Sequence, residues 1–561
     1  MIDSQPYASN DKGRHMQLRL KYLKDLRQPL EQVWDLIDQF ILPYALDVKQ
    51  KSPKFQLSNK IYDGTTINAS RLFASAFVGT VTPRGIPYID VVTDNDAYTQ
   101  ASKDLERYCK SLEAHFYDRF NESNFYERET IFVKKAGDYG TGAMYRHVNP
   151  ETGNHVYEVL ATKTYFIDED AYGEVDTVYR ELYIQNRHLP HRFPDANFNE
   201  RILNRIKNNS GDYTKVIHAV EPRADYDPSS PLAMKKRFSS CYALEEDNWF
   251  IADESGFDSF PYLIWRPEVA PGMVWGVGPG IYALRDSQIL QQAGRTLMDA
   301  ANKAVDPPWT VPIEIQGEEQ LFPGGRNYIS GQSSAMQPLI SGINYPIGQD
   351  QADRLRQAVE KHYFVDYFLM LNQMDARQRT ATEVMELQSE KSAVISSISS
   401  SYTSGVLDIL LENIFYEDIQ NGIVPRPIMP GSRGRPIKFT FNYVGPLAQA
   451  QKRYHKISGP QKAMQDILPI AQFKPEILDL LDVDSYAKLI ADANNSVSLI
   501  LDDKVVAQIR QSRAQQQQAM MQAQQQAQAT TVAGQYASQA SKSPEPGSPM
   551  ERLMKQQQVQ Q

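Results

Sequence analysis

The sequence predicts an α+β protein in which helices predominate. Apolar residues recur every three to four positions over residues 14–44, 279–304 and 380–420, which is the spacing of the buried face of a helix. Between residues 145 and 265 apolar and polar residues alternate, as they do in strands that bury one face. The chain has 561 residues, and at about 150 residues per domain this length favours three to four domains.

Helices are predicted for the first quarter of the chain. The first spans residues 14–44, where Pro43 stops the apolar pattern. The next helices are expected at residues 69–80, 94–121 and 124–144. The proline- and glycine-containing segment TPRGIPYIDV ends the first of these three. The last helix ends in the turn-prone sequence DYGTG.

Strands are predicted for the following region. The fragments HVYEVLATKTYFI and EVDTVYRELYI alternate apolar and polar residues, and the polar turn DEDAYG at residues 168–173 separates them. Further strands are expected at residues 214–220 and 262–265. A short helix at residues 197–208 interrupts this β-rich region.

Helix returns at residues 279–304, opened by a proline at a plausible first-turn position. A Pro- and Gly-rich segment with short strand-like pieces follows at residues 306–348, and another helix is expected at residues 350–371. After the polar stretch NQMDARQR, Thr380 and Glu383 have the spacing of a capping box, so the next long helix begins there.

The C-terminal part changes composition twice. One strand is predicted at residues 437–444, and several shorter helices at residues 446–501. Residues 502–528 are rich in Gln and Ala without proline, which favours a helix with a weak apolar seam. Residues 529–561 are rich in Ser, Pro and Gln, and we expect this tail to be disordered.

Composition and charge exclude several classes of protein. A hydrophobic content of 41% is enough for real cores, so disorder of the whole chain is excluded. The formal net charge is −9, which argues against tight nucleic-acid binding over the whole surface. Cys109 and Cys241 are too few for a disulfide scaffold; two free thiols are expected, although a pair stays open. No apolar run is long enough for a membrane span, and no export signal is expected.

The motif search finds no enzyme signature. The chain has no GxxxxGK[ST], HExxH or GxSxG sequence, which excludes a phosphate-binding P-loop and an in-chain packaging ATPase. The fragment WGVGPGIYAL places its third glycine wrongly for a dinucleotide loop, so a tight turn before a helix is expected. We therefore predict no catalytic residue and no cofactor.

Two groups of residues could be read as metal sites. Asp168, Asp170 and Gly173 resemble a calcium loop, but Tyr172 and Tyr179 occupy positions that need oxygen ligands, and this favours a hairpin turn.

His188, His191 and His218 could also bind a metal. Histidines that flank a proline in a polar loop are usually only solvated, however. No metal site is predicted.

Six fragments in order resemble podovirus-type head-to-tail connector (portal) proteins of bacteriophages. The family's elements are similar to LFASAFVGTVTP, DYGTGAMY, YFIDEDAYGEVDTVYRELYI, VIHAVEPR, FPYLIWRPEVAPGMVW followed by GVGPGIYALRD, and RQRTATEVMEL. Each fragment is weak alone, and their order over residues 72–387 makes the resemblance fairly specific. Beyond residue 422 the resemblance fades.

The resemblance implies a portal-type ring subunit with wing, stem, clip and crown and a Gln-rich C-terminal helix or tail. The segments implied are a wing at 1–278 and 380–445, stem helices at 279–305 and 350–371, a clip at 306–349, a tunnel loop at 372–379, a crown at 446–501, a Gln-rich helix or barrel at 502–528 and a disordered tail at 529–561.

The implied function is that of a short-tailed phage portal without catalysis of its own. Twelve copies would form a ring at one capsid vertex, through which double-stranded DNA passes during packaging and ejection. The implied partners are the major capsid protein, scaffold, terminase large subunit, tail adaptor and internal ejection proteins, with no membrane. The ring would assemble in the bacterial host cytoplasm and remain in the virion.

The resemblance also implies two sets of contact residues. The tunnel-loop candidates, which could touch phosphates transiently or be solvated connectors, are Asn372, Gln373, Asp375, Arg377, Gln378 and Arg379. The clip candidates, which would meet the adaptor, are Trp309, Gly324, Gly325 and Arg326. Trp309 is either an anchor of a small core or an interface hot spot.

Two alternatives to a portal stay open from the sequence. One is a hydrolase or nuclease with an unrecognised carboxylate site, for which DEDAYGEVD is the best candidate. The other is an oligomeric scaffold unrelated to DNA.

Overall fold

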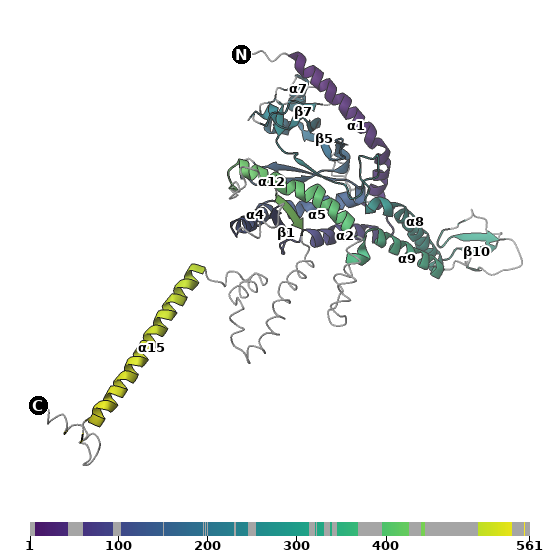
Figure 1. The fold of residues 1–561 in the computed structure, drawn as a ribbon. Helices are drawn as coiled ribbons and strands as arrows, with labels where there is room; N and C mark the ends of the chain where they lie inside the picture. The colour runs from purple at the N-terminus through teal and green to yellow at the C-terminus, as the bar shows by residue number, and fades with distance from the viewer. Residues whose placement is uncertain are drawn as a thin grey trace. The chain divides into compact units, whose positions relative to one another are not determined.

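The structure is a computed structural model in which the chain divides into two compact units, Met1–Pro446 and Leu447–Gln561. It describes residues 6–42, 60–93, 103–149, 151–194, 200–228, 232–244, 254–312, 322–329, 337–338, 345–368, 395–425, 439–443 and 503–540, with single positions at 196, 198, 230, 320, 552 and 555 (Figure 1).

The largest hydrophobic core of the first unit lies among helices. It joins α2 (Thr65–Val81), α4 (Lys103–Glu122), α5 (Phe125–Tyr139), α9 (Tyr345–His362) and α12 (Ile409–Gln420). Aromatic rings fill its centre: Phe77 stacks on Trp265 with centroids 5.2 Å apart, and Trp265 meets Tyr402 edge-on at 5.0 Å. Such pairs add directional packing to the burial of apolar area.

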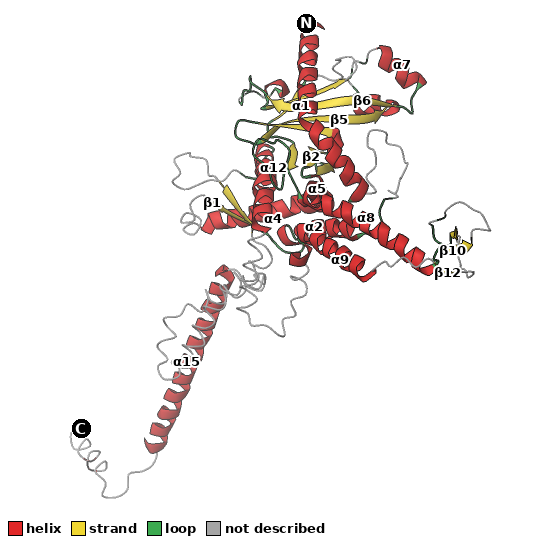
Figure 2. Cartoon of the chain, turned by 90° about the vertical axis from the view of Figure 1, so that its right-hand side faces the viewer, coloured by secondary structure: helices red, strands yellow, loops and turns green. Residues whose placement is uncertain are grey.

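Two antiparallel sheets form the β-rich region. The smaller has the order β3-β2-β9 and consists of β2 (Gly142–Val148), β3 (His155–Val159) and β9 (Tyr262–Trp265). The larger has the order β4-β5-β6-β7-β8, and its strands β5 and β6 are labelled in Figure 2. Its strands are β4 (Tyr165–Glu169), β5 (Val175–Gln185), β6 (Tyr213–Pro222), β7 (Phe238–Leu244) and β8 (Ser255–Phe257).

Helices cover both faces of the five-stranded sheet. On one face α1 (Pro6–Phe40) buries Met16, Leu20 and Leu23 against Ile217 of β6 and its neighbours. On the other face, the short helices α6 (Leu189–Arg192) and α7 (Glu200–Asn208) pack on Val216 and Leu244, among others. Adjacent residues of β6 point to opposite faces, so the alternation in the sequence sets both contacts.

Arg27 fixes the middle of α1 to the sheet. Its guanidinium is buried and donates to the carbonyl oxygens of Lys163, at 3.0 Å, and Tyr165, at 2.9 Å. It also lies 3.9 Å from the Phe166 ring centroid and pairs with Glu31 one turn along the helix at 2.6 Å. A buried guanidinium is stable because its donors are satisfied in this way.

Two glycine turns touch through their backbones at the base of α8 (Pro279–Val305). A Cβ atom at Gly276 would collide with the carbonyl oxygen of Gly140, and one at Gly278 with that of Gly137. Gly140, with φ of +83°, is also the left-handed residue that ends α5. The fragments DYGTG and GVGPG, far apart in the sequence, therefore meet where only glycine fits.

Several predicted elements differ from the structure. The helix expected over 124–144 ends at Tyr139, and Gly142 begins β2 because β9 pairs with this segment. The predicted helix 350–371 is α9, which begins at Tyr345 and stops at His362. Phe364 then takes a left-handed φ of +57°, and helix resumes only for residues 365–368.

The segment TPRGIPYIDV contains a strand that the sequence analysis missed. β1 (Ile89–Thr93) pairs antiparallel with β13 (Phe439–Tyr443), the strand predicted at 437–444. The long helix predicted from Thr380 is described from Ile395, and it includes a π-helical stretch, Thr403–Asp408, before α12. Its predicted start at Thr380 lies outside the described residues.

The second unit contains α15 (Asp503–Ala540). This helix extends past Gln528, where the sequence analysis placed the start of a disordered tail. The crown predicted at 446–501 lies outside the described residues. Neither Cys109 nor Cys241 forms a disulfide, which agrees with the expectation of free thiols.

The glycine contact gives a first prediction. Gly276→Ala or Gly278→Ala should lower the free energy of unfolding by about 3 kcal/mol, because the added methyl group collides with backbone that cannot rotate away. The control is Gly79→Ala in α2, where a Cβ atom meets nothing within 4 Å. Thermal denaturation compares them, and equal stability of all three variants would contradict the contact.

The second prediction concerns Glu129, a fully buried carboxyl group. Its Oε1 accepts hydrogen bonds from the hydroxyls of Thr82, at 2.6 Å, and Tyr402, at 2.5 Å, while Oε2 has no partner among the described residues. Burial outweighs these bonds and raises the pKa of Glu129 from 4.5 to about 7.

A carboxyl pKa that is raised in the folded state favours folding at low pH, so stability should fall between about pH 4.5 and 7. The loss is at most about 3 kcal/mol. Glu129→Gln should flatten this part of the pH profile of chemical denaturation and be more stable than the parent above pH 7. An unchanged slope would contradict the assignment.

Candidate functional site

The first feature of the candidate site is a pair of helices, α8 and α9, that pack side by side. Asp286 of α8 pairs with His362 of α9 at 3.1 Å. A Cβ atom at Gly348 of α9 would touch the Leu297 side chain, so the small residue allows close approach. Leu297 of α8 therefore packs against the second helix of the same chain.

Tyr62 and Asp63, just before α2, connect α8 with α9. The side-chain oxygen of Gln291 in α8 accepts hydrogen bonds from the backbone amides of Tyr62, at 2.6 Å, and Asp63, at 2.8 Å. Its side-chain nitrogen donates to the carbonyl oxygen of Asp63 at 2.8 Å. Arg356 of α9 pairs with the Asp63 carboxylate at 2.8 Å. Burial alone would raise the pKa of Asp63, but hydrogen bonds from Thr65 and the Arg356 guanidinium lower it overall.

The base of the pair is fixed at the end of α5. The buried carboxylate of Asp138 accepts hydrogen bonds from the Ser70 hydroxyl at 2.8 Å, the Lys134 ammonium at 2.9 Å and the Tyr363 hydroxyl at 2.9 Å. Tyr363 directly follows α9, and α8 begins beside Asp138 at Gly280. One carboxylate therefore connects α2, α5 and the end of α9.

The outer surface of α8 carries exposed apolar side chains. Tyr282 is 50% exposed, Ile289 39%, Met298 57% and Val305 87%. At about 100° per residue, Tyr282 and Ile289 point in nearly the same direction, whereas Met298 and Val305 point to the opposite side. The helix α8 thus carries two exposed apolar residues on each of two opposite sides.

A small sheet follows α8 and brings the predicted clip residues together. β10 (Trp309–Pro312) pairs parallel with β11 (Arg326–Ile329) and antiparallel with β12 (Gln337–Pro338). Trp309 lies opposite Arg326, and its amide donates to the Gly325 carbonyl oxygen at 2.6 Å. Gly324 has a φ of +75°, and its amide donates to the Asp306 carbonyl oxygen at 2.8 Å.

Trp309 is 37% exposed and Arg326 is exposed. Trp309 and Arg326 begin adjacent parallel strands, so the four predicted clip residues lie together at one end of this sheet. Their contact with an adaptor stays a prediction. The tunnel-loop residues Asn372, Gln373, Asp375, Arg377, Gln378 and Arg379 lie outside the described residues.

The fragment DEDAYGEVD forms a hairpin turn, as expected. Asp170 Oδ1 accepts the amides of Tyr172, at 2.8 Å, and Glu174, at 3.0 Å, and Gly173 has a φ of +86°. Asp168 pairs with Arg19 at 2.5 Å. These carboxylates hold the turn and the adjacent helix in place.

The three histidines are not arranged as metal ligands. His218 is buried in β6, where it bonds Ser240 at 3.0 Å and the Tyr262 hydroxyl at 2.8 Å, and burial lowers its pKa to about 3. His188 and His191 are exposed. Within the described part of the chain, no three His, Cys, Asp or Glu residues are placed to hold a metal ion.

A cavity of about 200 Å³ lies between β9 and the π-helical stretch. Trp265, Ser401, Ser404 and Gly405 are among its lining residues, with Glu174 and Arg266 as its charged ones. Arg266 is held by an ion pair with Glu169. The hydroxyls of Ser401 and Ser404 in this lining donate to the backbone carbonyl oxygens of Ile398 and Ser400, so they hold the local helix.

Sequence reasoning missed the residues that anchor the helix pair. Asp138 and Tyr363 are 225 positions apart, and Tyr62 and Gln291 are 229 apart. No local pattern links such positions; the only signal was the glycine turn beside Asp138. None of the helices in the described ranges has the length and apolar character that crossing a membrane requires.

Comparison with known proteins agrees with the resemblance described above. The chain is 27% identical over 550 residues to the portal protein of Salmonella phage epsilon15, which covers 95% of both chains. It is also 27% identical over 516 residues to the probable portal protein of Bordetella phage BPP-1, covering 90% of this chain and 92% of that one. A family model described as "Bacteriophage head to tail connecting protein" matches residues 14–497. The chain therefore belongs to the bacteriophage head-to-tail connecting protein family.

Proposed function

We propose that this chain is the portal protein of a short-tailed bacteriophage, the ring through which double-stranded DNA enters and leaves the capsid. The observation that carries the proposal is the family match over residues 14–497, together with two portal relatives that align along nearly the whole chain. Two paired helices, α8 and α9, with a small sheet between them in the chain are the architecture expected for a stem and clip. The role is structural, and the ATPase is a separate terminase.

The proposed arrangement follows the domain expectations. Residues 1–278 and 380–445 form the wing, α8 and α9 the stem, the sheet β10–β12 the clip, and 446–501 the crown. Residues 372–379 form the tunnel loop, whose two arginines touch phosphates transiently. The Gln-rich α15 extends the assembly on the crown side.

The ring requires that each subunit offers two different surfaces. A head-to-tail interface closes into a ring when its rotation closes, and one surface must fit the other. The two apolar surfaces on opposite sides of α8, one at Tyr282 and Ile289 and one at Met298 and Val305, supply such a pair. These two sides favour a ring, and we take its subunit number, twelve, from the family resemblance.

The charge of the chain suits a channel for moving DNA. Each copy carries a net charge of −9, so twelve copies carry roughly −108. A ring that is acidic overall repels phosphates, so no strong contact holds the duplex and it can slide. At the vertex, the proposed partners are the major capsid protein and scaffold, terminase at the clip during packaging, and then the tail adaptor and internal ejection proteins.

The third prediction tests assembly. Native mass spectrometry of the purified chain should show a species near twelve times 63.8 kDa. Met298→Glu together with Val305→Glu should shift the population towards monomer, because one apolar surface becomes charged, while circular dichroism stays unchanged. A stable dimer or tetramer of the parent chain would contradict the proposal.

The fourth prediction concerns the clip. Trp309→Ala should leave the ring mass unchanged but weaken binding of the tail adaptor at least tenfold, because exposed aromatic side chains dominate many interfaces. The control is Tyr226→Ala, which removes an aromatic residue of similar exposure, 44%, from a different loop. Aggregation of Trp309→Ala with loss of the ring would instead make Trp309 an anchor of the small sheet.

A further inference from the structure

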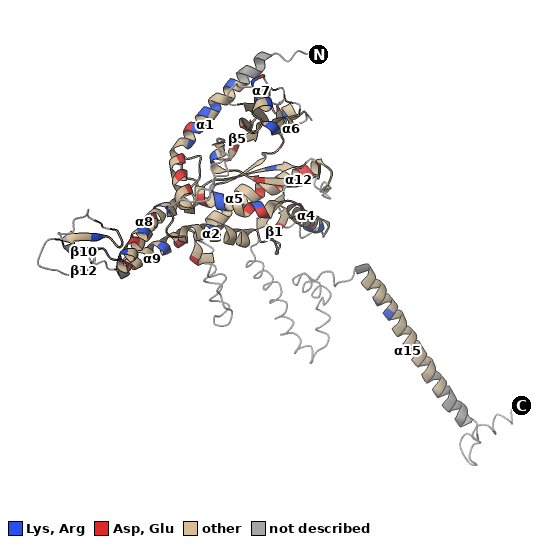
Figure 3. Cartoon of the chain, turned by 180° about the vertical axis from the view of Figure 1, so that it is seen from behind, with Lys and Arg blue, Asp and Glu red and all other residues tan. Residues whose placement is uncertain are grey.

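Two buried tyrosines anchor the ends of one segment of the chain to the same pair of helices. Tyr363, directly after α9, donates its hydroxyl to Asp138 of α5 at 2.9 Å. Tyr402, in the long helix described from Ile395, donates its hydroxyl to Glu129 of α5 at 2.5 Å. Both rings also pack on α2, which lies beside α5 (Figure 3). The residues between the two tyrosines therefore leave from and return to one support.

The two anchors differ in how a negative charge on the carboxyl group is compensated. Asp138 accepts a hydrogen bond from the ammonium group of Lys134 at 2.9 Å, in addition to those from hydroxyl groups. Glu129 accepts hydrogen bonds from hydroxyl groups alone, and its second oxygen has no partner among the described residues. A buried carboxylate without a counter-charge is costly. The anchor at Tyr402 is therefore the weaker one once its carboxyl group is ionised.

The ionisable groups that face Glu129 in the described part of the chain are phenols. They belong to Tyr402, to Tyr88 just before β1, and to Tyr126 of the same helix. Burial raises the pKa of all three phenols, so they are neutral near pH 7. The guanidinium of Arg84 lies over the Tyr126 ring, 5.6 Å from its centroid, and does not bond the carboxyl group. The charge on Glu129 is thus set by its own proton.

The helix changes geometry immediately after Tyr402. Thr403–Asp408 is a π-helical stretch, and helices bend sharply at such places. Beyond it α12 is fixed, because its buried Asp418 pairs with Arg119 of α4 at 2.6 Å. A bend at the π-helical stretch would therefore move the part of the helix before it and leave α12 in place.

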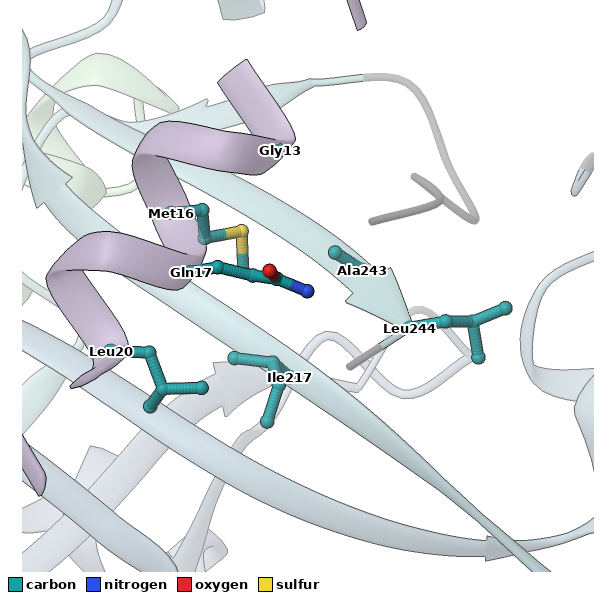
Figure 4. Close-up of a pocket in the computed structure, with 7 residues that line it drawn as sticks. All are labelled: Gly13, Met16, Gln17, Leu20, Ile217, Ala243 and Leu244. Atoms are coloured by element: carbon teal, nitrogen blue, oxygen red, sulfur yellow. The ribbon is translucent and has the colours of Figure 1, made fainter. Parts of the chain in front are cut away.

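A cavity gives this helix room to move away from Glu129. Ser401, Ser404 and Gly405 line the cavity of about 200 Å³ beside β9, whereas Tyr402 is fully buried in the core. The helix therefore has its anchor on one side and free volume on another. By comparison, α1 has no such room, because the recess between it and the five-stranded sheet encloses only about 10 Å³ (Figure 4).

We propose that Tyr402 and Glu129 form a pH-sensitive latch. When Glu129 loses its proton, Tyr402 is released and the helix before the π-helical stretch swings on that stretch, while Tyr363 stays bound to Asp138. The protonated carboxyl group needs no counter-charge, so it holds the latch closed. The ionised group gains hydration when the latch opens. This motion takes place within one chain, so it is independent of the proposed ring.

The sign and size of the effect follow from the two environments of Glu129. Burial raises the pKa of Glu129 from 4.5 to about 7 in the closed state, and opening returns the carboxyl group to water. A carboxyl group whose pKa is higher in the closed state favours that state at low pH. Since each pKa unit is a factor of ten, the ratio of open to closed helix should rise by at most roughly 300-fold across this range.

Hydrogen exchange of the full-length chain, followed by mass spectrometry at pH 6 and pH 8, tests the latch. Rates are corrected for the intrinsic pH dependence of exchange. We expect the protection of residues 395–408 to fall about tenfold between the two pH values, as the pKa of Glu129 requires. The protection of α9, next to the Tyr363 anchor, should stay the same.

Three variants separate the latch from other groups. Glu129→Gln, which does not ionise, should remove the pH difference. The matched control is Asp408→Asn at the far end of the π-helical stretch, where burial also raises the pKa of the carboxyl group and its partner is Tyr443 at 2.7 Å. This control should keep the difference. Tyr402→Phe keeps the ring but loses the hydrogen bond, so protection at pH 6 should fall about fivefold.

The parent chain decides the question even where a variant fails to fold. Equal protection of residues 395–408 at both pH values would overturn the latch. A pH difference that survives Glu129→Gln, or one that Asp408→Asn abolishes, would assign the titration to another group and overturn it too. Loss of protection in α2 and α5 together with this helix would indicate unfolding of the whole core, which also contradicts a local latch.

Discussion

Backbone contact between two glycine turns is the constraint on which the first unit depends. Gly276 and Gly278 lie against Gly140 and Gly137 so closely that a single methyl group would not fit. This contact sets where α8 leaves the helical core, and it brings the start of α8 beside Asp138. The buried carboxylate of Asp138 then holds Ser70, Lys134 and Tyr363, so the geometry of the helix pair follows from a packing condition at its base.

Elements with local signals could be predicted from the sequence. The bounds of α8 and the hairpin at Asp170 were found because proline, glycine and aspartate mark them directly. The pairing of β1 with β13 and the strand at Gly142 were missed, because their partners are distant in the chain. α9 ends at His362, and the left-handed Phe364 follows without a glycine or proline nearby, so tertiary packing sets that break. Within the candidate site, the turn residues around Trp309 could be found from composition, whereas the anchors at Asp138 and Gln291 could not.

The contacts around α8 differ in the force that stabilises them. The exposed apolar residues on α8 gain free energy from leaving water. The ion pairs of Arg356 with Asp63 and of His362 with Asp286 act through charge, and their attraction weakens as salt rises. The proposed contact between subunits and the anchoring of the helix pair therefore respond differently to ionic conditions.

The anchoring of α8 and α9 at one point also has a mechanical meaning. The chain departs from the end of α5 at Gly280 and returns to it at Tyr363, whose hydroxyl bonds the carboxylate beside that departure. The segment between them is therefore anchored at both ends to the same part of α5. Because both ends of this segment are held at Asp138, a displacement of its far end acts on the helical core through both helices.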